Sequence, residues 1–111
     1  YRFDTKQGSV VFAGDCADCP ELRKLAQGAG TLVVTCTFFG SQNVNPAISN
    51  VITGTYEVSA IANEAGVKQV VLTHMSPYFE KAGIKEAAVA EVARSFSGRI
   101  FCPDELTTIN L

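Results

Sequence analysis

Two side chains that can bind a metal stand directly after apolar runs of the chain. Asp15 follows residues 9–13, and the only histidine, His74, follows residues 69–73. Ligands of open α/β sheets gather at the carboxyl ends of the strands, so we expect both side chains at one edge of a sheet. A carboxylate and an imidazole both bind zinc, but a catalytic zinc site usually has three protein ligands. The sequence therefore predicts an incomplete site for zinc or another divalent metal.

A Cys-x-x-Cys pair, Cys16 and Cys19, lies between an expected strand and an expected helix. Cys16 adjoins Asp15 and is a candidate third ligand, because thiolate suits zinc. The same pair allows an alternative function in thiol redox chemistry, with Cys16 as the attacking thiolate, although neighbouring carboxylates oppose its ionisation. Cys36 and Cys102 lie in apolar runs, as free core cysteines do. This usage favours a reducing, cytoplasmic setting.

The hydrophobic pattern alternates between strand and helix periods. Residues 38–52 have no clear period, and a loop of that length is often functional or mobile. The expected order is ββαβαβαββ, which is an α/β fold with a mixed sheet and helices on one face. The expected strands are 1–4, 9–13, 31–35, 69–73, 99–102 and 105–111, and the expected helices are 18–27, 55–65 and 84–96.

Three aromatic residues lie at the start of the long loop or near the histidine. Phe38 and Phe39 open the loop, and Tyr78 follows His74. They either line a substrate pocket or pack beneath the loop as part of the core. The sequence leaves both arrangements open.

The composition limits the classes of protein to which the chain can belong. Its 111 residues, 47% of them hydrophobic, are typical of one globular domain over residues 1–111. No apolar run has the length of a membrane-spanning helix, and no signal peptide is expected. The net charge is −2 with acidic and basic residues interspersed, so we expect no nucleic-acid-binding patch. The chain begins without methionine in an expected strand, and we therefore expect a preceding segment.

Three segments resemble the metallo-β-lactamase superfamily, in the order in which that family carries them. Residues 11–19 with Leu22 resemble its hydrophobic-SGDT-xx-C-xx-L segment. Residues 28–38 resemble its GADLLVHECTF strand, and residues 64–77 are similar to its EAGVKxLVLTHxSP segment. The branch that these segments resemble most is that of the ribonuclease Z and arylsulfatase-like hydrolases.

The resemblance implies roles for two residues in a hydrolase of phosphodiesters, esters or lactams. Asp15 matches the aspartate that bridges two metal ions, and His74 matches a histidine that binds the second ion. The chain departs from the family at Cys16, which replaces the threonine of GDT, and at 52–53, where Ile-Thr replaces a His-Thr pair. The family's His-x-His-x-Asp-His motif is absent. The resemblance thus covers the C-terminal half of an αββα sandwich and implies a half-domain that is inactive alone.

Half of a sandwich leaves one apolar face of its sheet uncovered, and such a face is an interaction surface. We therefore expect the chain to pair sheet to sheet with an N-terminal half-domain or with a copy of itself in a homodimer. A non-catalytic, homo-oligomeric binding domain is the alternative function. In either case we expect weak zinc binding that depends on Asp15 and His74.

Overall fold

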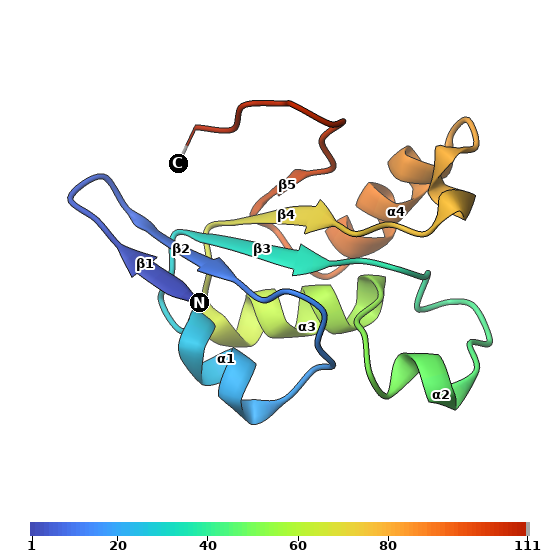
Figure 1. Ribbon diagram of the computed structural model, residues 1–111, viewed down its shortest axis with the longest axis horizontal. Helices are drawn as coiled ribbons and strands as arrows, with labels where there is room; N and C mark the ends of the chain where they lie inside the picture. Colours follow the sequence, from blue (N-terminus) through green and yellow to red (C-terminus); the bar gives the residue numbers. More distant parts are fainter. Residues whose placement is uncertain (111) are drawn as a thin grey trace.

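Five strands form one mixed sheet in the order β1-β2-β3-β4-β5 (Figure 1). The computed structural model describes residues 1–110. β1 pairs with β2 antiparallel, and each following pair of neighbours is parallel. The sheet is therefore mixed, as expected. The strands are β1 (Arg2–Asp4), β2 (Ser9–Phe12), β3 (Thr31–Thr35), β4 (Gln69–Thr73) and β5 (Arg99–Phe101).

Helices connect the parallel strands, as parallel pairing requires. The longest, α3, packs between α1 and α4, and Figure 1 shows α1 and α3 together on one side of the sheet. Glycines bound α3: the Gly54 N–H donates to Glu57 at 3.0 Å, and Gly66 ends the helix with φ 66°. The helical segments are α1 (Pro20–Ala26), α2 (Pro46–Ser49), α3 (Thr55–Ala65), the 3₁₀ helix η1 (Pro77–Glu80) and α4 (Ile84–Ala93).

The core lies between the sheet and these helices. Side chains alternate between the two faces of a strand, so residues in register share a face. Val11, Leu32 and Val70 are register neighbours, and each is 0% exposed within the main core cluster. This row fixes which face of the sheet the helices cover.

The next row of the register lies on the opposite face of the sheet. It consists of Phe12, Val33, Val71 and Phe101. Phe12 is 46% exposed, and its ring makes an edge contact with Phe3, which is 55% exposed, at a centroid distance of 6.0 Å. The face away from the helices therefore carries exposed aromatic rings.

Local structure differs from the sequence expectation at several helices, and the one expected at 84–96 ends at Ala93. The helix expected at 18–27 begins at Pro20, with Cys19 as its N-cap residue. α2 and η1 lie in stretches that have no helical period, and each has proline in its first turn, where a missing N–H costs nothing. Local backbone preferences determine these short helices, and neither is long enough to show a helical pattern of apolar residues in the sequence.

The expected last strand is the main correction. Residues 105–110 form no strand, and residue 111 of that expectation lies outside the described residues. A strand exists only by pairing, and the chain leaves the sheet after β5.

None of the helices within residues 1–110 has the length and apolar character needed to span a bilayer.

Candidate metal centre

A tight turn after β2 presents Asp15. The last bond of the strand joins the Ala13 N–H to the Val33 carbonyl at 2.9 Å. Gly14 then adopts φ 67°, a left-handed conformation that glycine accepts without steric cost. The chain therefore turns away from the sheet one residue before Asp15, and the carboxylate stays at the edge.

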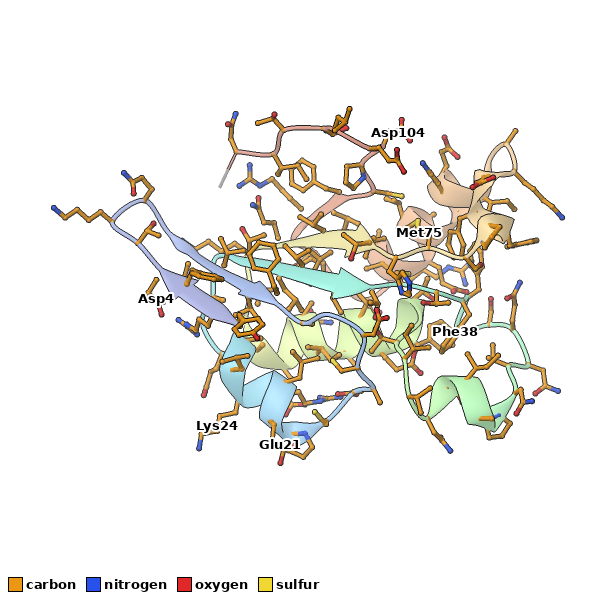
Figure 2. The ribbon with its side chains drawn as sticks, in the orientation of Figure 1. Asp4, Glu21, Lys24, Phe38, Met75 and Asp104 are labelled. Atoms are coloured by element: carbon orange, nitrogen blue, oxygen red, sulfur yellow. The ribbon has the colours of Figure 1, made fainter. Side chains whose placement is uncertain are left out.

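His74 follows β4 at the same edge, in a conformation that histidine rarely adopts. Its φ is 49°, which costs an L-residue on the order of 1 kcal/mol. The Thr37 hydroxyl, from the chain just after β3, donates to the His74 carbonyl at 3.2 Å. Figure 2 shows Met75, the next residue, at the end of β4. A strained backbone thus holds the imidazole, as is common at functional sites.

The two predicted metal ligands meet. His74 Nδ1 lies 2.9 Å from Asp15 Oδ1, and the two side chains are 60% and 64% exposed. Two ligands of a tetrahedral zinc ion lie about 3.3 Å apart when each is about 2.0–2.1 Å from the metal. The donor types suit two positions of a zinc site, and the observed 2.9 Å is that of a direct ion pair, somewhat closer than two ligands of one ion. No group of three His, Cys, Asp or Glu side chains suited to a metal occurs within residues 1–110.

Comparison with known proteins gives one consistent result, although no family model matches the chain. Ribonuclease Z of Mycobacterium marinum is 35% identical over 117 aligned residues, which are 100% of this chain and 41% of the relative. The metallo-β-lactamase fold protein YhfI from Bacillus subtilis superposes with a TM-score of 0.75 over 90% of this chain and 39% of its own, at 24% identity. The chain has part of a ribonuclease Z-like metallo-β-lactamase fold. Human tRNase Z, short form, also superposes, with a TM-score of 0.61 over 94% of this chain and 34% of its own, at 18% identity.

This metallo-β-lactamase-like chain spans between 41% and 51% of the length of the curated relatives that it matches. Ribonuclease Z of Mycobacterium tuberculosis gives the same picture, with 35% identity over 100% of this chain and 42% of the relative. The matches include the segments that carry Asp15 and His74. The incomplete ligand set thus accompanies an incomplete share of the fold.

The two cysteines of the Cys-x-x-Cys pair follow Asp15 in the chain but are not poised as reactive thiolates. Cys16 and Cys19 are free, half-buried thiols that pack against the core. Burial raises the pKa of Cys16, and the nearby Cys19, Asp15 and Asp18 raise it further. Reactive thiols have lowered pKa values, so the shift opposes redox chemistry at Cys16.

Two of the three aromatic residues, Phe39 and Tyr78, pack against each other, whereas the Phe38 ring lies against Gly54. Phe38 and Phe39 are buried, and Figure 2 shows Phe38 at the start of the loop after β3. The Phe39 ring stacks on Phe79 at 5.3 Å, and the ring of Tyr78, which is partly exposed, makes an edge contact with Phe39 at 6.3 Å. Two of the three rings are therefore buried, while the expected substrate role stays a prediction.

An open hollow of about 390 Å³ adjoins His74 on the side of η1 and α4. Its charged lining comprises His74 if protonated, one ammonium group from Lys85, and carboxylates from Glu80, Asp104 and Glu105. Lys85 is itself paired with Asp104. The hollow beside the candidate centre therefore has a negative charge surplus, as does the chain as a whole.

A buried carboxylate between α4, α3 and the loop after β3 was missed by the sequence interpretation. Glu91 of α4 is 5% exposed, and its Oε2 accepts the Gly40 N–H at 3.1 Å and the Thr55 hydroxyl. Burial by itself raises the pKa of Glu91, but hydrogen bonds from Ser41, Thr55 and Gly40 lower the pKa below its ordinary value. Glu91 therefore ties α4 to the start of α3 and to the loop after β3.

A signal for Glu91 exists in the sequence. The residue lies three positions after Ala88 and one before Val92, both of which are buried on the apolar side of α4. An acid on an apolar helix face needs hydrogen-bond partners, because a buried charge without them is costly. Its position alone could have marked it as structurally important.

The strain at His74 yields a stability prediction. We expect His74→Gly to raise the free energy of unfolding by about 0.5–1 kcal/mol relative to His74→Ala, because glycine relieves the left-handed strain while alanine retains it. Both variants remove the exposed side-chain contact with Asp15, so the comparison isolates the backbone. Urea denaturation measures the difference, and equal stability of the two variants would contradict strain at this position.

Proposed function

We propose that this chain is one part of a metal-dependent hydrolase and is inactive on its own. The supporting observation is the Asp15–His74 pair, 2.9 Å apart, at the carboxyl edge of a partial metallo-β-lactamase fold. The chain has one histidine in all, so the remaining ligands of a catalytic centre must come from elsewhere. Its substrate is a phosphodiester, an ester or a lactam.

Each of the two side chains has a distinct part in the proposed site. Asp15 has two oxygens and can span a pair of metal ions, whereas His74 offers one nitrogen to one ion. A bound metal would lower the pKa of a water molecule and so supply a nucleophile at neutral pH. The Gly14 turn and the Thr37–His74 hydrogen bond hold both ligands at one edge before any metal arrives.

The β1–β2 end of the sheet face away from the helices is the proposed contact with the rest of the enzyme, because Val71, farther along the same row, is only 6% exposed. Phe3 and Phe12 expose about half of their surface there, beside the row that contains Val33 and Phe101. Covering such a face removes apolar area from water, which is worth about 25 cal/mol per Å². The partner that we propose is the part of the fold that the relatives carry outside the match; a homodimer through the same face is the alternative.

The charge of the hollow bears on the substrate. Glu80, Asp104 and Glu105 outnumber Lys85 around it, so this chain provides no surplus of positive charge for a polyanion. We therefore propose that any cationic groups that hold a phosphodiester come from the rest of the enzyme.

The free state of the chain's cysteines supports the proposed cytoplasmic location.

A fusion protein tests the proposal. The part of Mycobacterium marinum ribonuclease Z that lies outside the match is joined to the N-terminus of the full chain, and hydrolysis of bis(p-nitrophenyl) phosphate is followed with zinc. We expect the fusion to be active and a chelator to stop it, while the chain alone remains inactive. His74→Ala in the fusion is the matched control and should remove the activity. Chelator-sensitive hydrolysis by the chain alone would contradict the proposal.

A further inference from the structure

The amino-terminal ends of the strands surround a small hollow that lies apart from the candidate metal centre. The hollow measures about 220 Å³ and is lined by the β1–β2 hairpin and by residues where β2, β3, β4 and β5 begin. Liquid water takes about 30 Å³ per molecule, so the space admits a small ion. In Figure 1 this hairpin lies at the end of the sheet opposite the arrowheads of β3 and β4. The five residues of β4 separate the hollow from His74, a length of roughly 15 Å.

The side-chain charge around this hollow is positive. Lys68 and Arg99 are exposed cations in its lining, and the described residues that line it include no carboxylate. The chain as a whole has a net charge of −2, so this concentration of positive charge is local. Backbone hydrogen bonds fix both residues beside the hollow: the Arg99 N–H donates to the Lys68 carbonyl, and the Lys68 N–H donates to the Gly30 carbonyl, each at 3.1 Å. The hollow therefore favours an anion.

A buried amide in the same lining has one unpartnered atom. Gln69 is 1% exposed, and it shares its sheet face with Thr31 and Arg99, its neighbours in register. Its Nε2 donates to the Thr31 hydroxyl at 2.7 Å, whereas its Oε1 accepts no hydrogen bond from residues 1–110. A buried acceptor without a donor is costly, so a ligand that donates to Oε1 gains affinity. Oε1 is covered in this structure, and binding requires a shift of the side chains around it.

We propose that this hollow binds inorganic phosphate, with Lys68 and Arg99 holding its anionic oxygens and Gln69 Oε1 accepting a hydrogen bond from its O–H. Inorganic phosphate keeps a proton at neutral pH, so one ion meets both requirements of the site. Sulfate has the same tetrahedral shape but no proton to donate at that pH, and a phosphodiester has none either. The inference goes beyond the proposed hydrolase function, because the ligand is not that substrate and the site needs no metal.

An NMR titration of the full chain tests the inference. Inorganic phosphate is added at constant ionic strength in the presence of a chelator, so that metal bound at the Asp15–His74 centre cannot contribute. We expect the amide shifts of Gly8, Gly30 and Arg99 to change and to saturate. Sulfate should bind about tenfold more weakly, because it leaves the Gln69 acceptor without a donor.

Two substitutions separate the charge from the hydrogen bond. Arg99→Gln should weaken phosphate and sulfate alike, by about threefold or more. Gln69→Leu removes the acceptor at a similar side-chain size, and it should reduce the affinity for phosphate to that for sulfate. Lys24→Gln is the matched control, because it removes an exposed cation of α1 outside the hollow. It should change neither affinity by more than about twofold, since exposed charges at a distance are screened.

Three results would overturn the inference. The first is equal affinity for phosphate and sulfate in the wild-type chain, because the Gln69 acceptor would then have no part in binding. The second is the absence of saturable shifts at the hollow, including shifts confined to the residues around His74. The third is a preference for phosphate that persists in Gln69→Leu. The titration uses the chain alone without metal, so failure of the hydrolase fusion to act on its substrate would not alter any of these results.

Discussion

Replacing Glu91 with alanine is expected to lower the free energy of unfolding by about 3 kcal/mol. At this position, which is 5% exposed, the substitution leaves the Thr55 hydroxyl without its acceptor, whereas the Gly40 N–H keeps its bond to the Thr55 hydroxyl at 2.7 Å. A hydrogen bond to a charged group contributes about 1.5–3 kcal/mol, and an unsatisfied buried donor costs about 1–3 kcal/mol. Urea denaturation measures the loss. Glu86→Ala is the matched control, because Glu86 is exposed on the same helix, and we expect a change within about 0.5 kcal/mol.

The Glu91 contribution should also depend on pH in one direction. The folded-state pKa of Glu91 is lowered from its model-peptide value of 4.5, so the folded state binds this proton less readily than the unfolded state does. The stabilisation is therefore complete above about pH 5 and is lost as the pH falls below 4.5 through the folded-state pKa. The stability difference between the wild type and Glu91→Gln should shrink over that window. A difference that is constant or grows towards acid would contradict a lowered pKa.

Loss of the Glu91 contact should loosen a particular region. Gly40 lies near the start of the loop after β3, and Thr55 is the first residue of α3. The Glu91 carboxylate therefore holds both ends of the segment between Gly40 and Thr55. The Gly40 N–H also donates to the Thr55 hydroxyl at 2.7 Å, which makes the three groups a single network. Hydrogen bonds in such a network strengthen one another, so the loss of one bond weakens the others. Exchange of the loop amides in Glu91→Ala should therefore rise before global unfolding does.

The central strands could be predicted because burial on both faces leaves a continuous apolar run. β3 and β4 show this pattern, and their predicted bounds match the observed ones. The segment at 105–111 shows similar strand propensity, yet its described part forms no strand. Propensity describes one segment, whereas a strand needs a neighbour, and the sequence of one segment contains no information on that neighbour.

The candidate centre also has features that the sequence predicts and features that it does not. Asp15 and His74 could be predicted to meet because each follows a strand, and strand ends share an edge. The left-handed turn at Gly14 could be predicted from the residue type, because glycine adopts a positive φ without steric cost. His74 gives no such signal, because histidine takes a negative φ at most positions and its residue type does not specify the φ of 49°. Tertiary constraint is what the local sequence could not show.

Zinc binding by the isolated chain should be weak and should disappear in His74→Ala. Asp15 and His74 are the two ligands that the structure brings within 2.9 Å, and both are well exposed, so a metal ion can reach them. Removing one of two ligands leaves a single contact, which exchanges freely with water. Isothermal titration calorimetry with zinc should therefore show a small heat in the wild type and none in His74→Ala. Asp15→Asn should weaken binding about tenfold or more.

Cys16→Ser is the matched test of the third ligand. Zinc binds the thiolate, and the raised pKa of Cys16 makes its deprotonation at neutral pH more costly. Cys16 also packs against the core, so turning its sulfur towards Asp15 would sacrifice buried contact. We therefore expect Cys16→Ser to change the zinc affinity by less than about threefold, while His74→Ala abolishes binding. If zinc uptake persists in His74→Ala and is lost in Cys16→Ser, the metal site lies at the Cys-x-x-Cys turn and not at the end of β4.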